Sequence, residues 1–164
     1  PVPVRLLLAE AVERIRPAGE LRSIGFDVDE PPPDLAVSAD RRQVVSAVFN
    51  LLENAVKYSD EGSTVLLRAG CTAGDEVAIT VEDHGIGIPA KDLERVFERF
   101  YRVDQGRSRQ TGGTGLGLAI VRHVAANHGG EVTVSSRLGV GSTFTLVLPG
   151  AVLPAHSPSL ATSV

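Results

Sequence analysis

The chain has 164 residues, of which 43% are hydrophobic and 22% charged, an ordinary composition for one globular domain with a sizeable core. Its net charge of −4 and its lack of a long apolar run give no reason to expect nucleic acid or a bilayer as the main partner. The single cysteine, Cys71, excludes an internal disulfide framework.

The N-terminal part of the chain predicts one helix and two short strands. Apolar residues recur at helical spacing from Leu6 to Ile15, and the Pro-Ala-Gly sequence at 17–19 is expected to end that helix. Ser23 to Val28 is expected to form a strand. Three prolines at 31–33 separate it from a second short strand at Leu35 to Val37.

A long helix is predicted to begin at Asp40, because Gln43 three residues later completes a capping-box pattern, and to end near Tyr58. At about 100° per residue, two neighbouring stripes run along it. The first is apolar and is expected to face the core; its members are Val44, Val48, Leu51 and Ala55. The second is polar and holds the candidate site residues Asn50, Asn54, Lys57 and Tyr58.

The rest of the chain predicts four strands, one helix and one segment without a regular period. The strands are expected at Thr64–Ala69, Glu76–Val81, Glu131–Ser136 and Ser142–Leu148, the helix at Gly115–Asn127, and the irregular segment at Gly85–Thr111, with short helical pieces around 91–100. Three helices and five to six strands in mixed order predict an α+β sandwich with one sheet face covered. Because the chain lacks methionine and a signal-peptide pattern, we expect a piece of a longer protein.

Two asparagines in the interior of the long helix disfavour the helix and need another explanation. On a functional interpretation, Asn54 gives an amide oxygen to Mg²⁺, Lys57 reaches phosphate oxygens and Tyr58 packs on a nucleotide base. On a structural interpretation, the amides bond a neighbouring loop. The helix alone does not decide between the two.

An apolar strand delivers Asp83 to its end, directly before the loop Gly85-Ile-Gly87-Ile88-Pro89. A carboxylate in this position can accept a hydrogen bond from an exocyclic amine such as that of adenine. The alternative is a charged strand-end residue beside a turn. For Asp83 in isolation, that alternative is favoured.

Three alternating glycines, Gly113, Gly115 and Gly117, lead into the predicted helix at 115–127. Glycines let a ligand approach the backbone, and a helix N-terminus offers free N–H groups, so the segment predicts a phosphate cradle without a lysine. A flexible loop would not explain glycines inside the helix, where each costs about 1 kcal/mol relative to alanine. The lysine-bearing phosphate loop is absent, and a dinucleotide fingerprint at 85–90 lacks the βαβ unit that it requires.

Four segments, in this order, resemble the boxes of the catalytic and ATP-binding domain of bacterial sensor histidine kinases, in the superfamily that includes gyrase, Hsp90 and MutL. They are Asn50–Tyr58 (N box), Asp83–Gly87 (G1 box), Phe97–Arg102 (F box) and Gly113–Leu118 (G2 box), followed by Gly141-Ser-Thr143. The resemblance covers residues 1–149. The stretch 94–149 further resembles actinobacterial phosphate-regulon sensor kinases.

The resemblance implies an α/β sandwich of the Bergerat type, with three helices on one face of a mixed sheet of about five strands. It implies ATP and Mg²⁺ as cofactors and a mobile ATP lid at 85–112. Apart from the resemblance, the Ala, Ser and Pro content after Pro149 predicts a disordered tail at 150–164. It assigns Asn50 and Asn54 to catalysis and Asn54 to the metal. The nucleotide-binding residues that it implies are Asn54, Lys57, Tyr58, Asp83 with help from Thr143, Gly85, Gly87, Ile88, Tyr101, Arg102, Gly113, Thr114, Gly115, Leu116, Gly117 and Leu118.

Asn50 indicates whether the chain hydrolyses ATP or transfers its phosphate. ATPase members of the superfamily carry a glutamate base at its position, and an amide cannot take a proton from water. A neutral imidazole needs little activation, so transfer to a histidine can rely on positioning and electrostatics, and we predict a protein-histidine kinase. The four histidines of the chain lie outside a phosphoacceptor sequence context; they are His84, His123, His128 and His156.

The accepting histidine is therefore expected on a separate helical dimerisation domain, with a response regulator downstream. Phe97 and Phe100 would dock on that domain, or else form a satellite of the core beneath the lid. We expect a monomeric domain in the cytoplasm, part of a membrane-anchored kinase, with no nucleic acid and no membrane contact of its own. Two alternatives stay open: a non-catalytic nucleotide-sensing module and a serine-directed anti-sigma-type kinase.

Overall fold

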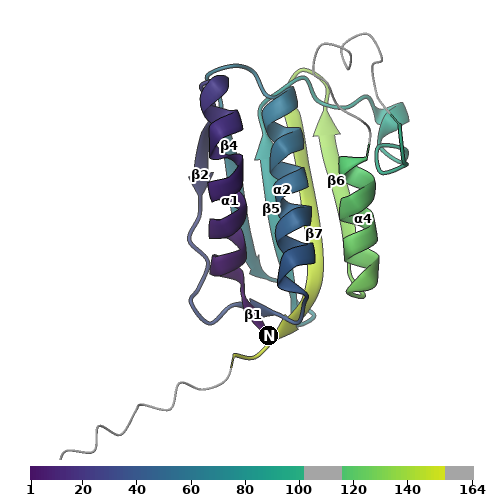
Figure 1. Ribbon diagram of the computed structural model, residues 1–164. Coiled ribbons are helices and arrows are strands. Elements are labelled where there is room, and N and C mark those ends of the chain that lie inside the picture. The colour runs from purple at the N-terminus through teal and green to yellow at the C-terminus, as the bar shows by residue number, and fades with distance from the viewer. Residues whose placement is uncertain (102–115, 154–164) are drawn as a thin grey trace, which may run out of the picture.

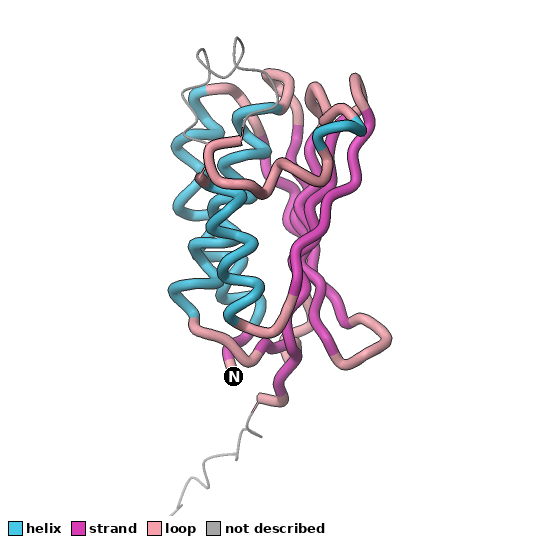
Figure 2. The backbone as a smooth tube through the Cα atoms, turned by 90° about the vertical axis from the view of Figure 1, so that its right-hand side faces the viewer, coloured by secondary structure: helices cyan, strands magenta, loops and turns pink. Residues whose placement is uncertain are grey.

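The computed structural model describes residues 1–101 and 116–153, which form two layers. Three helices lie side by side on one face of a single sheet, as Figure 1 shows face-on and Figure 2 shows from the side. The helices are α1 (Val4–Leu21), α2 (Arg41–Tyr58) and α4 (Gly117–Asn127). The predicted α+β sandwich with its helices on one face is confirmed.

The sheet has seven strands. They are β1 (Val2–Pro3), β2 (Gly25–Val28), β3 (Ala36–Val37), β4 (Thr64–Cys71), β5 (Glu76–Asp83), β6 (Glu131–Arg137) and β7 (Gly141–Ala151). Their order is β1-β3-β7-β5-β4-β2, with β6 also paired to β7. The β2–β4 pair is parallel and the other pairs are antiparallel, so the sheet is mixed as predicted. All six predicted strands are present, and the two-residue β1 is added to them.

The start of α2 follows the prediction in part. The Asp40 side chain accepts a hydrogen bond from the Gln43 N–H at 3.2 Å, so Asp40 is the N-cap. The reciprocal half of the capping box is replaced, because the Asp40 N–H donates to His128 Nε2 at 3.0 Å. His128 Nδ1 lies 2.7 Å from the Val124 carbonyl oxygen, so the imidazole joins the end of α4 to the start of α2.

The predicted apolar stripe of α2 lies at the centre of the core, and its four residues expose at most 1% of their surface. Alternate residues of two central strands face it: Val77, Ile79 and Val81 on β5, and Phe144, Leu146 and Leu148 on β7, each at most 1% exposed. Side chains alternate along a strand, so the next residues on this face are Asp83 at the end of β5 and Ser142 at the start of β7.

The first helix runs farther than predicted, since α1 continues through Pro17 to Leu21. Pro17 has no N–H to donate to the Glu13 carbonyl, but both residues lie on the exposed side of α1, where water can bond that carbonyl. Gly19 is not a stop signal either. A Cβ there would come within 2.6 Å of the Phe26 ring, so the glycine lets β2 pack closely against α1.

The last strand also runs farther than predicted. Gly150 and Ala151, expected to begin the tail, pair with Val37 and Ala36 of β3, because the sheet continues past Pro149. Residues 102–112 of the predicted lid and 154–164 of the predicted tail lie outside the described residues. Among the helices that the structure describes, none combines the length and apolar character needed to cross a membrane.

Candidate nucleotide-binding site

Asp83 is a carboxylate at the buried end of β5, with 3% of its surface exposed. It accepts hydrogen bonds from the backbone N–H of Ser142, at 3.2 Å, and from that of Gly85. Burial nevertheless raises the pKa of Asp83 to about 6, because the charged form loses more hydration than the two hydrogen bonds replace. A carboxylate in this position is suited to a ligand that donates a further hydrogen bond to it.

The residue beside Asp83 on the neighbouring strand is Ser142 and not the predicted Thr143. Asp83 lies opposite Ser142, and Glu82 lies opposite Thr143. Ser142 is 7% exposed on the helix-facing side, whereas Thr143 alternates to the other face of the sheet. Sequence reasoning missed Ser142, although the period of two along the apolar residues of β7 could have found it.

Two hydroxyl groups tie the loop after Asp83 to the β6–β7 hairpin. Ser136 Oγ donates to the Gly141 carbonyl at 2.9 Å and accepts from the Ile88 N–H at 2.7 Å. It also lies 2.8 Å from Ser142 Oγ, and since its own hydrogen is already used, Ser142 is the donor of that bond. The predicted site residue Ile88 is therefore held through its backbone, and its side chain packs against the core.

The glycines after Asp83 allow backbone segments to touch one another. A Cβ at Gly85 would overlap the Tyr58 carbonyl at the end of α2, and a Cβ at Gly87 would overlap the Arg137 carbonyl at the end of β6. Gly87 also has a φ of 72°, which most side chains disfavour. The close approach predicted at these two glycines is thus made by the protein's own backbone. The contact at Gly85 lets the end of α2 lie next to the end of β5.

Asn50 connects α2 to the start of α4. Its Nδ2 donates to the Ser46 carbonyl one turn earlier, at 2.8 Å. Its Oδ1 lies 3.2 Å from the place where a Cβ on Gly117 would stand, so glycine at this position leaves room for the amide. The structure therefore brings the N box and the G2 box together. Leu116 is the N-cap of α4, and Gly117 and Leu118 form its first turn.

The other predicted site residues of α2 are half-buried; they are Asn54, Lys57 and Tyr58. Within the residues that the structure describes, the Asn54 amide has no hydrogen-bond partner. Lys57 Nζ lies 3.5 Å from Glu53 Oε1, a partly exposed pair of the kind that contributes little free energy and that a phosphate group can replace. Tyr58 ends the helix beside Gly85. Part of each of the three side chains is exposed at this end of the sheet.

Arg22 holds the end of α2, and sequence reasoning missed it. Its guanidinium donates to the carbonyl groups of three residues, Val56, Lys57 and Ser59, the last at 2.8 Å. The Tyr58 carbonyl accepts from the Ile86 N–H at 3.2 Å. The last carbonyls of α2 thus all have partners, and a cation lies at the negative end of the helix dipole. No local pattern marks Arg22, because its partners lie 34 to 37 positions away.

The two phenylalanines predicted to dock on a partner have different surroundings. Phe97 is 8% exposed, and its ring meets the Phe144 ring edge to face with the centroids 6.0 Å apart. Phe97 thus belongs to the core, which is the structural alternative for this residue. Phe100 is 70% exposed, so only Phe100 offers its ring to another molecule in this structure.

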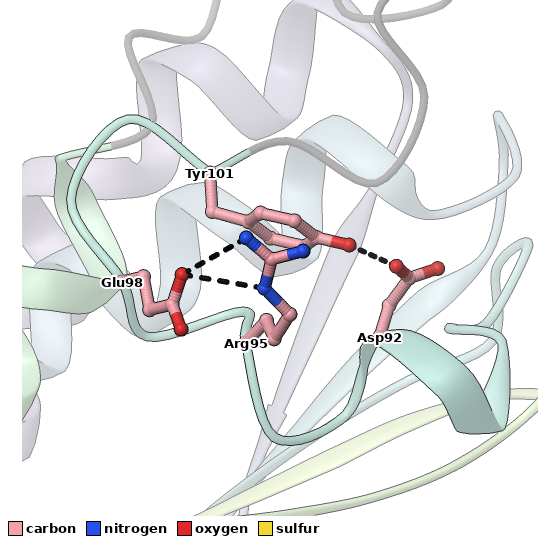
Figure 3. Close-up of polar contacts among 4 residues, drawn as sticks. All are labelled: Asp92, Arg95, Glu98 and Tyr101. Atoms are coloured by element: carbon pink, nitrogen blue, oxygen red, sulfur yellow. Dashed lines mark hydrogen bonds and ion pairs between the residues drawn. The ribbon is translucent and has the colours of Figure 1, made fainter.

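Tyr101 makes its contacts within its own segment (Figure 3). Its hydroxyl donates to Asp92 Oδ1, and its ring lies against the Arg95 guanidinium. The nucleotide contact predicted for Tyr101 stays a prediction. The segment begins with the short 3-10 helix η1 (Ala90–Asp92) and continues in turns, where short helical pieces were expected. The predicted site residues Arg102, Gly113, Thr114 and Gly115 lie outside the described residues.

The arrangement of a mixed sheet, one layer of helices and an acidic strand end facing α2 is shared with a known class of proteins. Residues 39–152 match the family of histidine kinase-, DNA gyrase B-, and HSP90-like ATPases, and the chain belongs to that family. The matched range contains α2, β5, α4, β6 and β7, and leaves out Arg22.

Within this family, the chain is similar to proteins named as sensor histidine kinases. The chain is 47% identical over 155 residues to the sensor-like histidine kinase SenX3 of Mycobacterium tuberculosis, a match that covers 94% of this chain and 37% of SenX3. It is 46% identical over 120 residues to the sensor histidine kinase WalK of Bacillus subtilis, covering 73% of this chain and 20% of WalK. The chain therefore spans a minor part of the length of these relatives.

Solved structures show the same fold. The mycobacterial sensor histidine kinase MprB has a TM-score of 0.79 and 31% identity, with 93% of this chain and 97% of that chain covered. Full-length ShkA in complex with AMPPNP has a TM-score of 0.80 and 33% identity, with 94% of this chain and 32% of ShkA covered. The mycobacterial relatives confirm the predicted resemblance to actinobacterial sensor kinases.

Proposed function

We propose that the chain binds Mg·ATP and donates the γ-phosphate to a histidine on a separate helical dimerisation and phosphoacceptor domain. The observation that carries the proposal is the buried Asp83 carboxylate, which faces the helix layer where the end of β5 meets the end of α2. The relatives that are named sensor histidine kinases support it, as does the ATP analogue present in the ShkA structure.

At the base end of the site, Asp83 accepts a hydrogen bond from the adenine amine. This bond favours the charged carboxylate, so nucleotide binding should weaken as the pH falls below the Asp83 pKa of about 6. Ser142 orients the carboxylate through its backbone N–H. Tyr58, fixed beside Gly85, packs on the base.

At the phosphate end, the residues present fit a magnesium nucleotide. Asn54 would give an amide oxygen to Mg²⁺, and Lys57 would exchange Glu53 for a phosphate oxygen. No group of three His, Cys, Asp or Glu side chains that could hold a metal occurs among the described residues, which suits an ion that takes most of its ligands from phosphate and water. When bound, the ion would neutralise phosphate charge. Backbone N–H groups at the start of α4 would bind the phosphates.

Asn50 favours transfer over hydrolysis. Its Nδ2 is bonded to the Ser46 carbonyl, so its Oδ1 is the part turned toward the start of α4. An amide oxygen can accept a hydrogen bond but cannot remove a proton from water, so water lacks a base at this position. A neutral imidazole is itself a nucleophile at neutral pH and needs only to be aligned with the γ-phosphate.

The test mixes the chain with radiolabelled ATP, Mg²⁺ and a purified phosphoacceptor domain of a sensor histidine kinase. We expect acid-labile, base-stable label on that domain, none when its acceptor histidine is replaced by glutamine, and at least a 100-fold slower transfer by N54A. Fast ATP hydrolysis by the chain alone would contradict the proposal. Binding without transfer would favour the nucleotide-sensing module, and acid-stable label on serine would favour the anti-sigma-type kinase.

The proposal extends to the whole protein from which this domain comes. The phosphohistidine would pass its phosphate to an aspartate of a response regulator. The domain would act in the cytoplasm as part of a membrane-anchored sensor, with 85–112 as its ATP lid. Its relatives are much longer than the part that this chain matches, which supports a partner domain elsewhere in the same protein.

A further inference from the structure

Four side chains between the end of η1 and Tyr101 are linked by contacts with one another (Figure 3). They are Asp92, Arg95, Glu98 and Tyr101, and we call them the clasp. The Tyr101 hydroxyl donates to Asp92 Oδ1, and the Arg95 guanidinium carbon lies 4.6 Å from the centre of the Tyr101 ring. Glu98 Oε2 accepts from Arg95 Nε and Nη2, each at 3.4 Å. The clasp therefore holds Tyr101 both at its hydroxyl and at its ring face.

Asp92 is the fixed end of the clasp. It is 5% exposed, its N–H donates to the Pro89 carbonyl at 2.9 Å, and its carbonyl accepts from the Val96 N–H at 3.1 Å. Its Oδ2 is buried and has no hydrogen-bond partner among the described residues. Burying a carboxylate with one oxygen unsatisfied costs free energy. Local stability therefore does not explain why an acid stands at this position.

Phe100 has a backbone conformation that its own side chain disfavours. Its φ is 64°, in the left-handed region where a bulky residue is an outlier, and its ring is 70% exposed. Such a conformation persists only when its surroundings impose it. Here the chain is fixed on both sides, since Phe97 lies in the core and Tyr101 lies in the clasp. Contacts of Phe97 and Tyr101 thus hold the backbone on both sides of Phe100.

We propose that Asp92 is a positioning residue which, through Tyr101, holds Phe100 outward to contact the phosphoacceptor domain. The inference rests on the proposed function and adds to it a residue pair that sets the geometry of docking. An isolated exposed aromatic ring is suited to an apolar patch on that helical domain, since burying the ring removes a large apolar surface from water. Tyr101 then serves docking through Asp92 and does not need to touch the nucleotide.

The kinetic test uses D92L, which removes the bond and the buried charge, and F100A, which removes the ring. Both variants should raise the KM for the phosphoacceptor domain about 10-fold. Because Asp92 lies in the proposed ATP lid, all rates are measured at saturating Mg·ATP, and the effect of D92L should fall on the acceptor KM and not on the kcat. The double variant should be no worse than F100A, because both changes remove one interaction. A D92L variant with an unchanged acceptor KM, or with a loss confined to the kcat, would overturn the docking inference and leave the proposed function standing.

A spectroscopic test reports on the clasp without any partner. The chain has two tyrosines and no tryptophan, so the alkaline absorbance titration of the wild type minus that of Y101F isolates Tyr101. The hydrogen bond to Asp92 raises the pKa of Tyr101 above its ordinary value of 10.0. In D92L the midpoint should fall back toward that value, and an unchanged midpoint would contradict the clasp.

Two controls separate the outcomes. If D92L does not fold, D92A takes its place in both tests with the same expected directions, because alanine also removes the bond and the charge. F100G should unfold at a higher urea concentration than F100A, because glycine adopts a φ of 64° without strain; the reverse order would contradict the conformation of Phe100. If the wild-type chain transfers no phosphate to any histidine domain, the proposed function fails first and the docking inference fails with it.

Discussion

At the scale of a single residue, Asp83 makes the free energy of unfolding depend on pH. Its pKa in the folded chain is about 6, compared with 3.8 for the free carboxyl group, so between these values the folded chain holds more protons than the unfolded chain. The free energy of unfolding therefore falls as the pH rises through this window. The difference of about two pKa units corresponds to a fall of about 3 kcal/mol at most, since each unit is worth about 1.4 kcal/mol.

D83N lacks this titration. We expect urea denaturation to show that the stability of the wild type relative to D83N falls by about 1–3 kcal/mol between pH 4 and pH 7.5. We also expect D83N to bind ATP at least about 10-fold more weakly at pH 7.5, because its amide offers one acceptor where the carboxylate offers two. A stability difference that does not change with pH would contradict the raised pKa of Asp83.

Ser142 and Thr143 provide a matched pair of variants on the two faces of the sheet. S142A removes the hydroxyl that donates to Ser136 beside Asp83, whereas T143V changes a side chain on the opposite face. Isothermal titration with ATP should show about a fivefold loss of affinity for S142A, within the range of about 1 kcal/mol for one hydrogen bond, and little change for T143V. The reverse result would restore Thr143 as the site residue.

At the scale of the helices and strands, the stability of α2 depends on a residue outside it. R22A should lower the free energy of unfolding by about 2–3 kcal/mol, because three helix-end carbonyls lose a charged donor in a half-buried position. It should also weaken ATP binding, since Lys57 and Tyr58 lie at that helix end. R22K should recover part of both losses, because lysine keeps the charge but lacks the planar fork.

Rescue by a small molecule distinguishes positioning by Arg22 from a general loss of packing. Guanidinium at low millimolar concentration should restore ATP affinity to R22A and leave the wild type unchanged. R22A that binds ATP as tightly as the wild type would show that the end of α2 keeps its place without Arg22.

The strands and helices were largely predictable, and their exceptions have physical causes. The apolar stripe of α2 and the alternation along β5 and β7 are strong periodic signals, and these elements lie where they were expected. Pro17 misled the prediction because an exposed carbonyl tolerates the loss of its partner, and Gly19 misled it because its role is contact with Phe26. Thr143 was chosen by motif, whereas the strand period selects Ser142.

At the scale of the whole molecule, Ile88, Val96 and Phe97 attach the segment after β5 to the core, and Phe97 has the largest side chain of the three. F97A should lower the free energy of unfolding by about 3 kcal/mol, because it leaves a cavity against Phe144. F100A should change it by less than about 0.5 kcal/mol, because the ring is mostly exposed. Urea denaturation of both variants decides between core and surface roles, and equal losses would contradict the different surroundings of the two rings.

The sequence alone determined the two-layer fold, the carboxylate at the end of β5 and the order of the motifs along the chain. These follow from hydrophobic periodicity and local turn chemistry, which are properties of neighbouring residues. Only the tertiary structure decided that Arg22 binds the end of α2, that Gly85 and Gly87 admit backbone, and that Phe97 is buried while Phe100 is exposed. The physical reason is that these contacts join residues far apart in the sequence, so they form only when the layers pack together.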